Sequence, residues 1–134
     1  MLNYEETQEA LSRQIDALPP EIFKDLNGGV ALRQDTLYDA NGLLILGQYH
    51  VEPYGLGRYV TINYGSMAVA FRYLDAEAFT EKLRDTLHHE LIHHLESLAG
   101  DRSLEVKDAQ DIAKMLAAMP NYRSNSNPNN GACC

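Results

Sequence analysis

The chain has 134 residues, of which 45% are hydrophobic, and a formal net charge of −8. A chain of this length buries one core, so we expect a single domain over residues 1–120 and no second catalytic domain. The acidic balance, without any cluster of Lys and Arg, disfavours nucleic acids and anionic membranes as partners, because both bind basic surfaces.

The sequence also indicates in which cellular compartment the protein is expected. No segment approaches the roughly 18 consecutive apolar residues of a membrane-spanning helix, and residues 1–6 lack the basic and apolar regions of a signal peptide. The two cysteines, Cys133 and Cys134, are adjacent, so no disulfide framework exists, and nothing nearby supports lipidation or a metal site there. We therefore expect a cytoplasmic protein.

The first part of the chain reads as helix followed by strands. Apolar residues among charged ones predict a helix over Tyr4–Leu18, which Pro19 and Pro20 end. A second, short helix is expected through Glu21–Leu26. β-branched, aromatic and aliphatic runs then predict three strands, at 30–32, 43–49 and 58–64.

The second part is predicted to be helical. Gly65 and Ser66 are expected to break the third strand before a helix-compatible segment at 67–73. A long helix is predicted over Ala76–Ala99, with Asp75 as its N-cap and Gly100 as its stop. A last helix is expected near Leu104–Met119, and the polar residues 121–134 are expected to be a disordered tail.

The long helix carries the sequence His89-Glu90-Leu91-Ile92-His93, which is the H-E-x-x-H signature of zinc peptidases. Residues four apart lie one above the other on a helix, so His89 and His93 can bind one metal ion. Glu90 can then take a proton from a metal-activated water and deliver it to a leaving amine. The motif predicts a zinc-dependent hydrolase.

A helical wheel separates a core face from a chemical face. The core face is a stripe of leucines: Leu83, Leu87, Leu91, Leu95 and Leu98. His89, His93 and Glu96 cluster opposite, with Glu90 between the two faces and directed toward the rim of the metal site. His88 and His94 lie off the metal direction, so we interpret them as packing or hydrogen-bonding residues rather than ligands.

A small sheet beside such a helix can bind an extended peptide by adding it as a further strand. The strand at 58–64 is the candidate edge for this role, and an interior strand whose tyrosines pack is the equal alternative. Tyr59, Tyr64 and His50 are the neutral donors available to stabilise an oxyanion, although for each of them a structural role is the stronger interpretation.

Together these residues resemble the minimal zincin-like metallopeptidases of bacteria, particularly the branch found in Firmicutes, over Tyr4–Ala118. The resemblance is carried by five stretches: Leu18-Pro19-Pro20-Glu21, Leu46-Gly47-Gln48-Tyr49-His50, Gly57-Arg58-Tyr59-Val60, Tyr64-Gly65-Ser66 and the run from His89 to Gly100. It implies a compact α+β zincin-like fold, in which a small mostly antiparallel or mixed sheet packs on the motif helix. It also implies zinc held by His89 and His93, with Glu90 as the general base.

The third metal ligand is where the chain departs from those relatives, which resemble H-E-x-x-H-x-x-G-x-x-D. Here Glu96 stands at the Gly position and Ala99 at the Asp position. A carboxylate from further along the chain is therefore needed, and Asp108 is the first choice because it resembles the Asp that opens the last helix in the relatives. Asp101 and Glu105 are alternatives, and Glu96 better suits a role in orienting a histidine.

Three functions are compatible with this sequence. The first is a zinc-dependent metallopeptidase that cuts an extended or unfolded peptide. The second is a metal-dependent amidohydrolase acting on a small molecule rather than a peptide, and the third is a non-catalytic metal-binding interaction module. The sequence leaves the substrate and oligomeric state open, and its His and carboxylate ligands also suit metals other than zinc.

Overall fold

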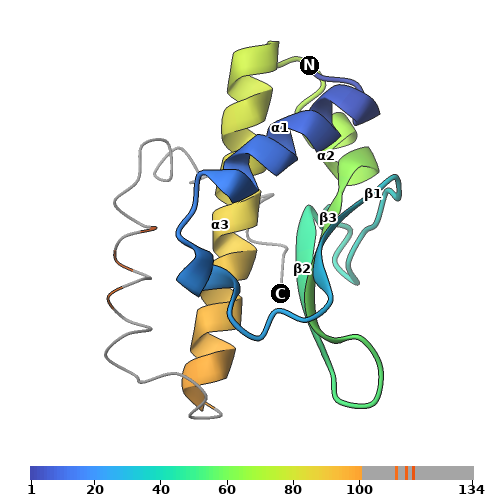
Figure 1. Ribbon diagram of the computed structural model, residues 1–134. Helices are drawn as coiled ribbons and strands as arrows, with labels where there is room; N and C mark the ends of the chain where they lie inside the picture. The colour runs from blue at the N-terminus through green and yellow to red at the C-terminus, as the bar shows by residue number, and fades with distance from the viewer. Residues whose placement is uncertain (101–110, 112–113, 115, 117–134) are drawn as a thin grey trace.

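The computed structural model describes residues 1–100 together with residues 111, 114 and 116 (Figure 1). The chain folds as a small α+β domain with a three-stranded mixed sheet, as the sequence predicts. In chain order the elements are α1 (Tyr4–Asp16), the 3-10 helix η1 (Pro20–Phe23), β1 (Gly29–Arg33), β2 (Gly47–Glu52), β3 (Gly57–Asn63), α2 (Tyr64–Ala70) and α3 (Ala76–Gly100). In the described part of the chain, no helix is long and apolar enough to cross a membrane.

The strand order of the sheet is β1-β3-β2. The central strand β3 pairs in parallel with β1 and antiparallel with β2, to which a short hairpin connects it. The prediction that residues 58–64 form an edge strand is therefore wrong, and the interior alternative is confirmed. The edge strands are β1 and β2, because β3 pairs with β2 on one side and with β1 on the other.

The long helix α3 packs on one face of the sheet, and α1 packs across α3. β2 and α3 are in direct contact, because a Cβ added to Gly47 would lie 2.9 Å from Cγ2 of Thr86. α1 crosses the N-terminal half of α3, where the side-chain amide of Gln14 donates a hydrogen bond to the backbone oxygen of Thr80 at 3.0 Å (Figure 1). Side chains alternate along a strand, so Tyr49 shares the face of Gly47, whereas His50 is on the opposite face.

The first helix follows the prediction closely. α1 begins after Asn3, whose side chain accepts a hydrogen bond from the backbone of Glu6, while the Glu6 carboxylate accepts one from the backbone of Asn3. It ends at Asp16, two residues before the predicted end. The second predicted helix is only the four-residue 3-10 turn η1, since the chain leaves the helical conformation after Phe23.

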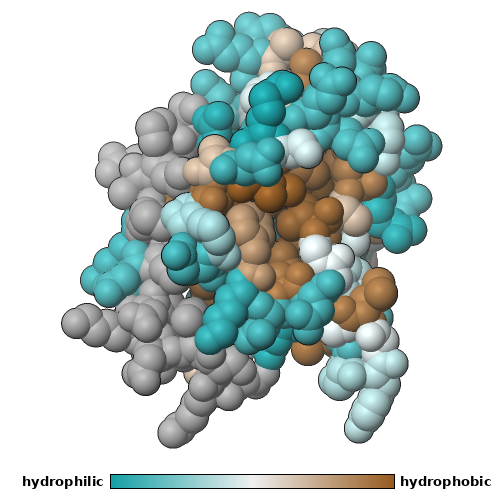
Figure 2. Space-filling model, viewed as in Figure 1, coloured by the Kyte–Doolittle hydropathy of each residue, from teal (hydrophilic) through white to brown (hydrophobic). Residues whose placement is uncertain are grey.

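Between α1 and β1 a shallow hollow remains on the surface. Figure 2 shows apolar side chains gathered in the middle of this view, framed by hydrophilic residues. The hollow is lined by residues of both elements: Gln8, Leu11, Ser12, Ile15, Val30, Ala31 and Leu32. It lies where α1 packs beside the edge strand β1, and Tyr4 ties the two elements by donating to the backbone oxygen of Leu32 at 2.9 Å.

The second strand lies further along the chain than predicted. β2 covers Gly47–Glu52, whereas the sequence predicts 43–49. The prediction is wrong because it assigns the aliphatic residues before Gly47 to the strand. Leu44 and Leu46 are only 8% and 1% exposed, and they pack in the core from the segment that leads into β2. Burial, not strand pairing, explains their apolar character.

The third strand ends at Asn63, one residue before its predicted end, and a helix follows as predicted, but Gly65 and Ser66 lie inside this helix rather than before it. α2 starts at Tyr64 and contains both residues. A Cβ at Gly65 would collide with Oγ1 of Thr36 and would lie 2.6 Å from the backbone oxygen of Asp35. Glycine is therefore used here for the close approach of α2 to the chain that follows β1, and not to end a secondary structure element.

The long helix α3 is confirmed to within one residue. Its N-cap is Asp75, whose carboxylate accepts a hydrogen bond from the backbone of Ala78 at 2.8 Å. All five leucines of the predicted stripe are fully buried. Of the predicted last helix, residues 111, 114 and 116 are described and are helical, and Leu116 is buried in the core. The remainder of that helix and the tail at 121–134 lie outside the described residues.

The tight contact at Gly47 gives a testable prediction. Gly47→Ala would place a methyl group 2.9 Å from Thr86 Cγ2 and 3.2 Å from Glu90 Cγ, so we expect a destabilisation of about 1–3 kcal/mol from overpacking. The control is Gly100→Ala, where a Cβ meets nothing within 4 Å. Urea denaturation of both variants measures the difference, and equal stabilities would contradict the close contact.

Candidate metal centre

The two motif histidines converge in the structure. The Nε2 atoms of His89 and His93 are 3.2 Å apart, and their rings are nearly perpendicular, at 87°. Two nitrogens that each bind a tetrahedral zinc at about 2.0–2.1 Å lie about 3.3 Å from each other. The separation therefore fits one metal ion held between the two rings. Both side chains are partly exposed, so this pair faces the surface rather than the core.

Glu96 lies on the far side of the His93 ring. Its Oε1 atom is 3.5 Å from Nδ1 of His93, whereas the nitrogen that faces His89 is Nε2. A carboxylate beside the remote nitrogen of a metal-binding histidine fixes the ring orientation and strengthens the ligand. The geometry supports the predicted orienting role of Glu96 rather than a role as a ligand.

The sequence predicts that Glu90 points toward the rim of the metal site, and in the structure its side chain is fully buried. Its Cγ atom lies 3.2 Å from where a Cβ of Gly47 would be, so the side chain sits between α3 and the first residue of β2. The side chain is buried because Gly47, which has no side chain, lets the sheet reach over this part of the helix. Glu90 thus directly follows His89 in the chain, and its side chain lies beside an edge strand.

The third ligand is not settled by the described residues. Within residues 1–100 and the three further helical positions, no group of three His, Cys, Asp or Glu side chains is arranged to hold a metal ion. Asp108, Asp101 and Glu105 lie outside the described residues. The structure therefore brings together two of the three predicted ligands, and Asp108 stays a prediction.

The three proposed oxyanion donors lie elsewhere. The Tyr64 hydroxyl donates to the backbone oxygen of Leu2 at 2.7 Å, and its ring packs on Phe79, which precedes His89 by ten residues or about 15 Å of helix. His50 and Tyr59 stack on each other at 4.3 Å on the sheet face opposite α3. All three have structural contacts, which is the interpretation that the sequence favours for each of them, and none of them lies where an oxyanion donor is needed.

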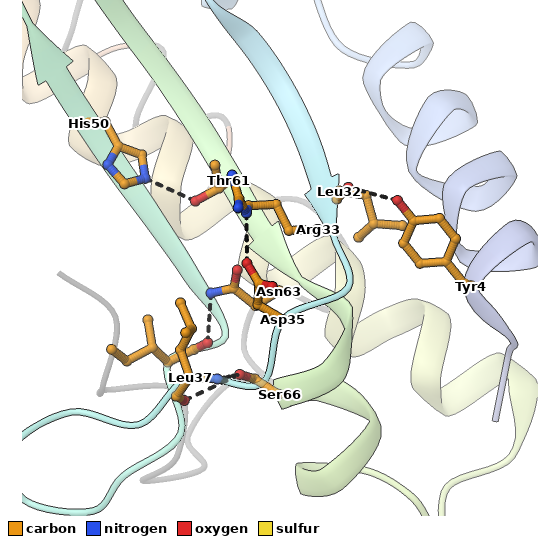
Figure 3. A network of polar contacts seen from close by, with 10 residues as sticks. Tyr4, Leu32, Arg33, Asp35, Leu37, His50, Thr61, Asn63 and Ser66 are labelled. Carbon is orange, nitrogen blue, oxygen red and sulfur yellow. Dashed lines mark hydrogen bonds and ion pairs between the residues drawn. The ribbon is translucent and has the colours of Figure 1, made fainter.

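Figure 3 shows the setting of His50 on this outer face. Its Nε2 atom lies 2.9 Å from Oγ1 of Thr61 on the neighbouring strand, and Tyr59 donates a hydrogen bond to Glu52. Partial burial lowers the pKa of His50, and the bond to Glu52 raises the pKa of the Tyr59 hydroxyl. These contacts link β2 to β3 from the face that α3 does not cover.

His94 connects three parts of the fold. Its Nε2 atom is 2.7 Å from the backbone oxygen of Lys24, so this nitrogen donates a proton. Nδ1 then accepts a hydrogen bond from the Tyr49 hydroxyl at 2.8 Å, and that hydroxyl accepts one from Arg58 at 3.1 Å. Arg58 also donates to Ser97. The structural role of His94 is confirmed, whereas no spacing in the sequence pointed to Tyr49 or Arg58 as its partners.

His88 is also a core residue, as predicted, with 1% exposure. Burial lowers its pKa to about 4, with a smaller effect from the neighbouring charge of Arg84. Burial likewise lowers the pKa values of His89 and His94. For His89 the shift has a chemical consequence, because the neutral imidazole is the form that binds metal.

Comparison with known proteins gives a relative without a known activity. No family model matches the chain, and no curated protein matches it. A solved structure of a conserved hypothetical protein from Thermus thermophilus is 31% identical, with a TM-score of 0.62, and the match covers 74% of this chain and 99% of that one. The chain belongs to the same family as this protein.

The Thermus relative supports the fold but carries no functional information, because it is described only as hypothetical. The resemblance to minimal zincin-like metallopeptidases therefore stays a prediction from the sequence. What the structure adds to it is local: the spacing of His89 and His93, the position of Glu96 and the burial of Glu90.

The low pKa of His88 predicts acid sensitivity. The unfolded chain binds a proton at this residue near pH 6.5 and the folded chain only near pH 4, so stability is complete above pH 6.5 and falls as the pH drops to about 4. The difference between the two pKa values corresponds to about 3 kcal/mol. In metal-free protein, His88→Leu should reduce the loss of unfolding free energy between pH 7 and pH 4 by that amount. An unchanged pH profile in urea titrations would contradict it.

The His94 hydrogen bonds give a second prediction. Tyr49→Phe removes the hydroxyl that donates to His94, leaving a buried ring nitrogen without that donor, so we expect a loss of about 1–3 kcal/mol. Tyr59→Phe is the matched control, because it removes a hydroxyl whose bond to Glu52 is exposed, and it should change stability much less than Tyr49→Phe does. Thermal and urea unfolding of the two variants measure both effects.

Proposed function

We propose that the chain is a zinc-dependent metallopeptidase with a zincin-like site. The proposal rests on one observation above all: two imidazole nitrogens 3.2 Å apart, next to a buried glutamate on the same helix. Zinc, when bound, supplies Lewis acidity, which polarises a carbonyl group and lowers the pKa of water to about 7. His89 and His93 would hold it, with Asp108 as the proposed third ligand.

Glu90 is the proposed general base. Its carboxylate would accept the proton of the attacking water and then donate that proton to the leaving amine, as peptide hydrolysis requires. Burial between α3 and β2 supports this role, because a carboxylate held by packing on both sides needs little reorganisation during the reaction. His93 would be kept in its ligating orientation by Glu96.

The edge strand β2 is the proposed binding site for an extended peptide. It pairs with β3 on one side, and no described strand pairs with its other side. β2 begins at Gly47 beside Glu90, so a peptide added along its outer edge would pass the histidine pair. This role falls to β2 rather than to 58–64, the strand favoured from the sequence. As part of the same proposal, the substrate is a peptide or protein and the protein is located in the cytoplasm.

Metal analysis of substituted proteins tests the proposal. Wild type should bind one zinc, and Glu90→Gln should keep it while losing peptide hydrolysis by about 10²-fold or more, since the general base is gone. His93→Ala should lose the zinc and Asp108→Ala should hold it more weakly. His50→Ala is the control, because this histidine is on the opposite face of the sheet and its removal should leave zinc content unchanged.

The outcomes separate the three candidate functions. Zinc binding with full activity in Glu90→Gln would refute the mechanism. Zinc without hydrolysis of any peptide, but with hydrolysis of small amides, would favour the amidohydrolase. Zinc closed by four protein ligands, without a bound water, would favour the interaction module. No zinc in wild type after its addition would exclude the metallopeptidase.

A further inference from the structure

The hairpin that joins β2 and β3 exposes three large apolar side chains. Val51, Tyr54 and Leu56 are 50%, 104% and 62% exposed, and they lie within six consecutive residues. We call this group the hairpin tip. Single exposed apolar residues are common on protein surfaces, whereas several together mark a place where another molecule binds. Figure 1 shows the hairpin projecting beyond the end of the sheet, at the lower right.

The tip is held in a defined conformation. β2 and β3 are paired from Gly47 opposite Ile62 to Glu52 opposite Gly57, directly up to the turn. Within the turn, the backbone of Gly55 donates to the backbone oxygen of Glu52 at 3.0 Å. The Glu52 side chain in turn accepts a hydrogen bond from Tyr59 on β3. A ligand that binds such a rigid projection loses little free energy to ordering it.

The tip is continuous with the candidate site through β2. This strand starts at Gly47, in contact with Glu90, and reaches Val51 after four residues, or about 13 Å. Gly47 and Val51 are an even number of residues apart, so they share the face toward α3. A peptide paired with the outer edge of β2 would therefore bring one side chain to the tip about four residues from the bond near Glu90.

We propose that the hairpin tip binds a bulky apolar side chain of the substrate, about four residues from the bond that is cut. The inference rests on the proposed peptidase function and adds a substrate class to it: extended, uncharged or basic peptides with such a residue. An acidic peptide is disfavoured, because the chain carries a net charge of −8, the exposed Glu52 is the last residue of β2, and the exposed Glu96 lies beside His93.

The test measures binding and cleavage separately. Fluorescein-labelled twelve-residue peptides of Ser, Gly and Lys, each with one Phe moved along the sequence, are titrated in fluorescence anisotropy against zinc-loaded Glu90→Gln protein. The same titrations use this protein with Tyr54→Ala and Leu56→Ala added. The control instead adds Tyr73→Ala and Val69→Ala, which remove exposed side chains of 87% and 41% exposure away from the hairpin. All four added substitutions are at exposed positions, and thermal unfolding verifies that each protein is folded.

We expect the Phe peptides to bind at one favoured Phe position, and the tip variant to weaken that binding about tenfold or more, as losing the burial of one large apolar side chain predicts. The control variant should bind as Glu90→Gln does, and Phe→Ser in the peptide should remove the difference between them. Equal affinities in the tip and control variants, or no dependence on Phe position, would overturn the inference.

Cleavage assays with the Glu90 side chain intact distinguish this result from the proposed function. If the protein cuts the Phe peptides and the tip variant raises KM about tenfold with little change in kcat, the inference holds. If cutting is normal in the tip variant, the inference is overturned while the peptidase stands. If nothing is cut but the tip still governs anisotropy, the peptidase proposal fails, and the tip is a peptide-binding surface without catalysis.

Discussion

The contact between Gly47 and the middle of α3 is the constraint on which the arrangement depends. Only a residue without a side chain lets the start of β2 approach Thr86 and Glu90 so closely. This approach sets the height and rotation of the helix against the sheet. It also places the part of α3 that carries Thr86 and Glu90, between which His89 lies in the chain, against the start of the edge strand β2.

The hydrogen bonds of His94 hold the same two elements together one turn further on. A buried imidazole is costly unless both nitrogens are satisfied, and here the carbonyl of Lys24 and the hydroxyl of Tyr49 satisfy them. These partners fix one tautomer of a neutral ring. Because His94 directly follows His93, the bonds that anchor one residue also limit how far its neighbour can rotate away from His89.

The sequence predicted what depends on local periodicity and missed what depends on tertiary contacts. α3 was predicted almost to the residue because its leucine stripe and its N-cap are local signals. The start of β2 was misplaced because Leu44 and Leu46 are apolar for the core rather than for a strand, and Gly65 appeared to be a break because its close contact with Thr36 is distant in sequence. The four-residue spacing alone predicts that His89 and His93 lie close together. No local pattern, however, predicts that β3 is the central strand of the sheet.

The composition of the buried surface of α3 is harder to explain by folding alone. Asp85, His88, Glu90 and His94 are each at most 1% exposed, in a helix whose leucines already supply a full apolar stripe. Burying ionisable groups costs free energy that apolar side chains at the same positions would not. The hydrogen bonds of His94 compensate for its burial, and the Glu90 side chain is buried on the same helix, one residue after His89. A divalent cation between His89 and His93 would lower that cost for Glu90, because it places positive charge next to the buried carboxylate. Under the proposed function, this burial of ionisable side chains reflects selection for chemistry at the site as well as for stability.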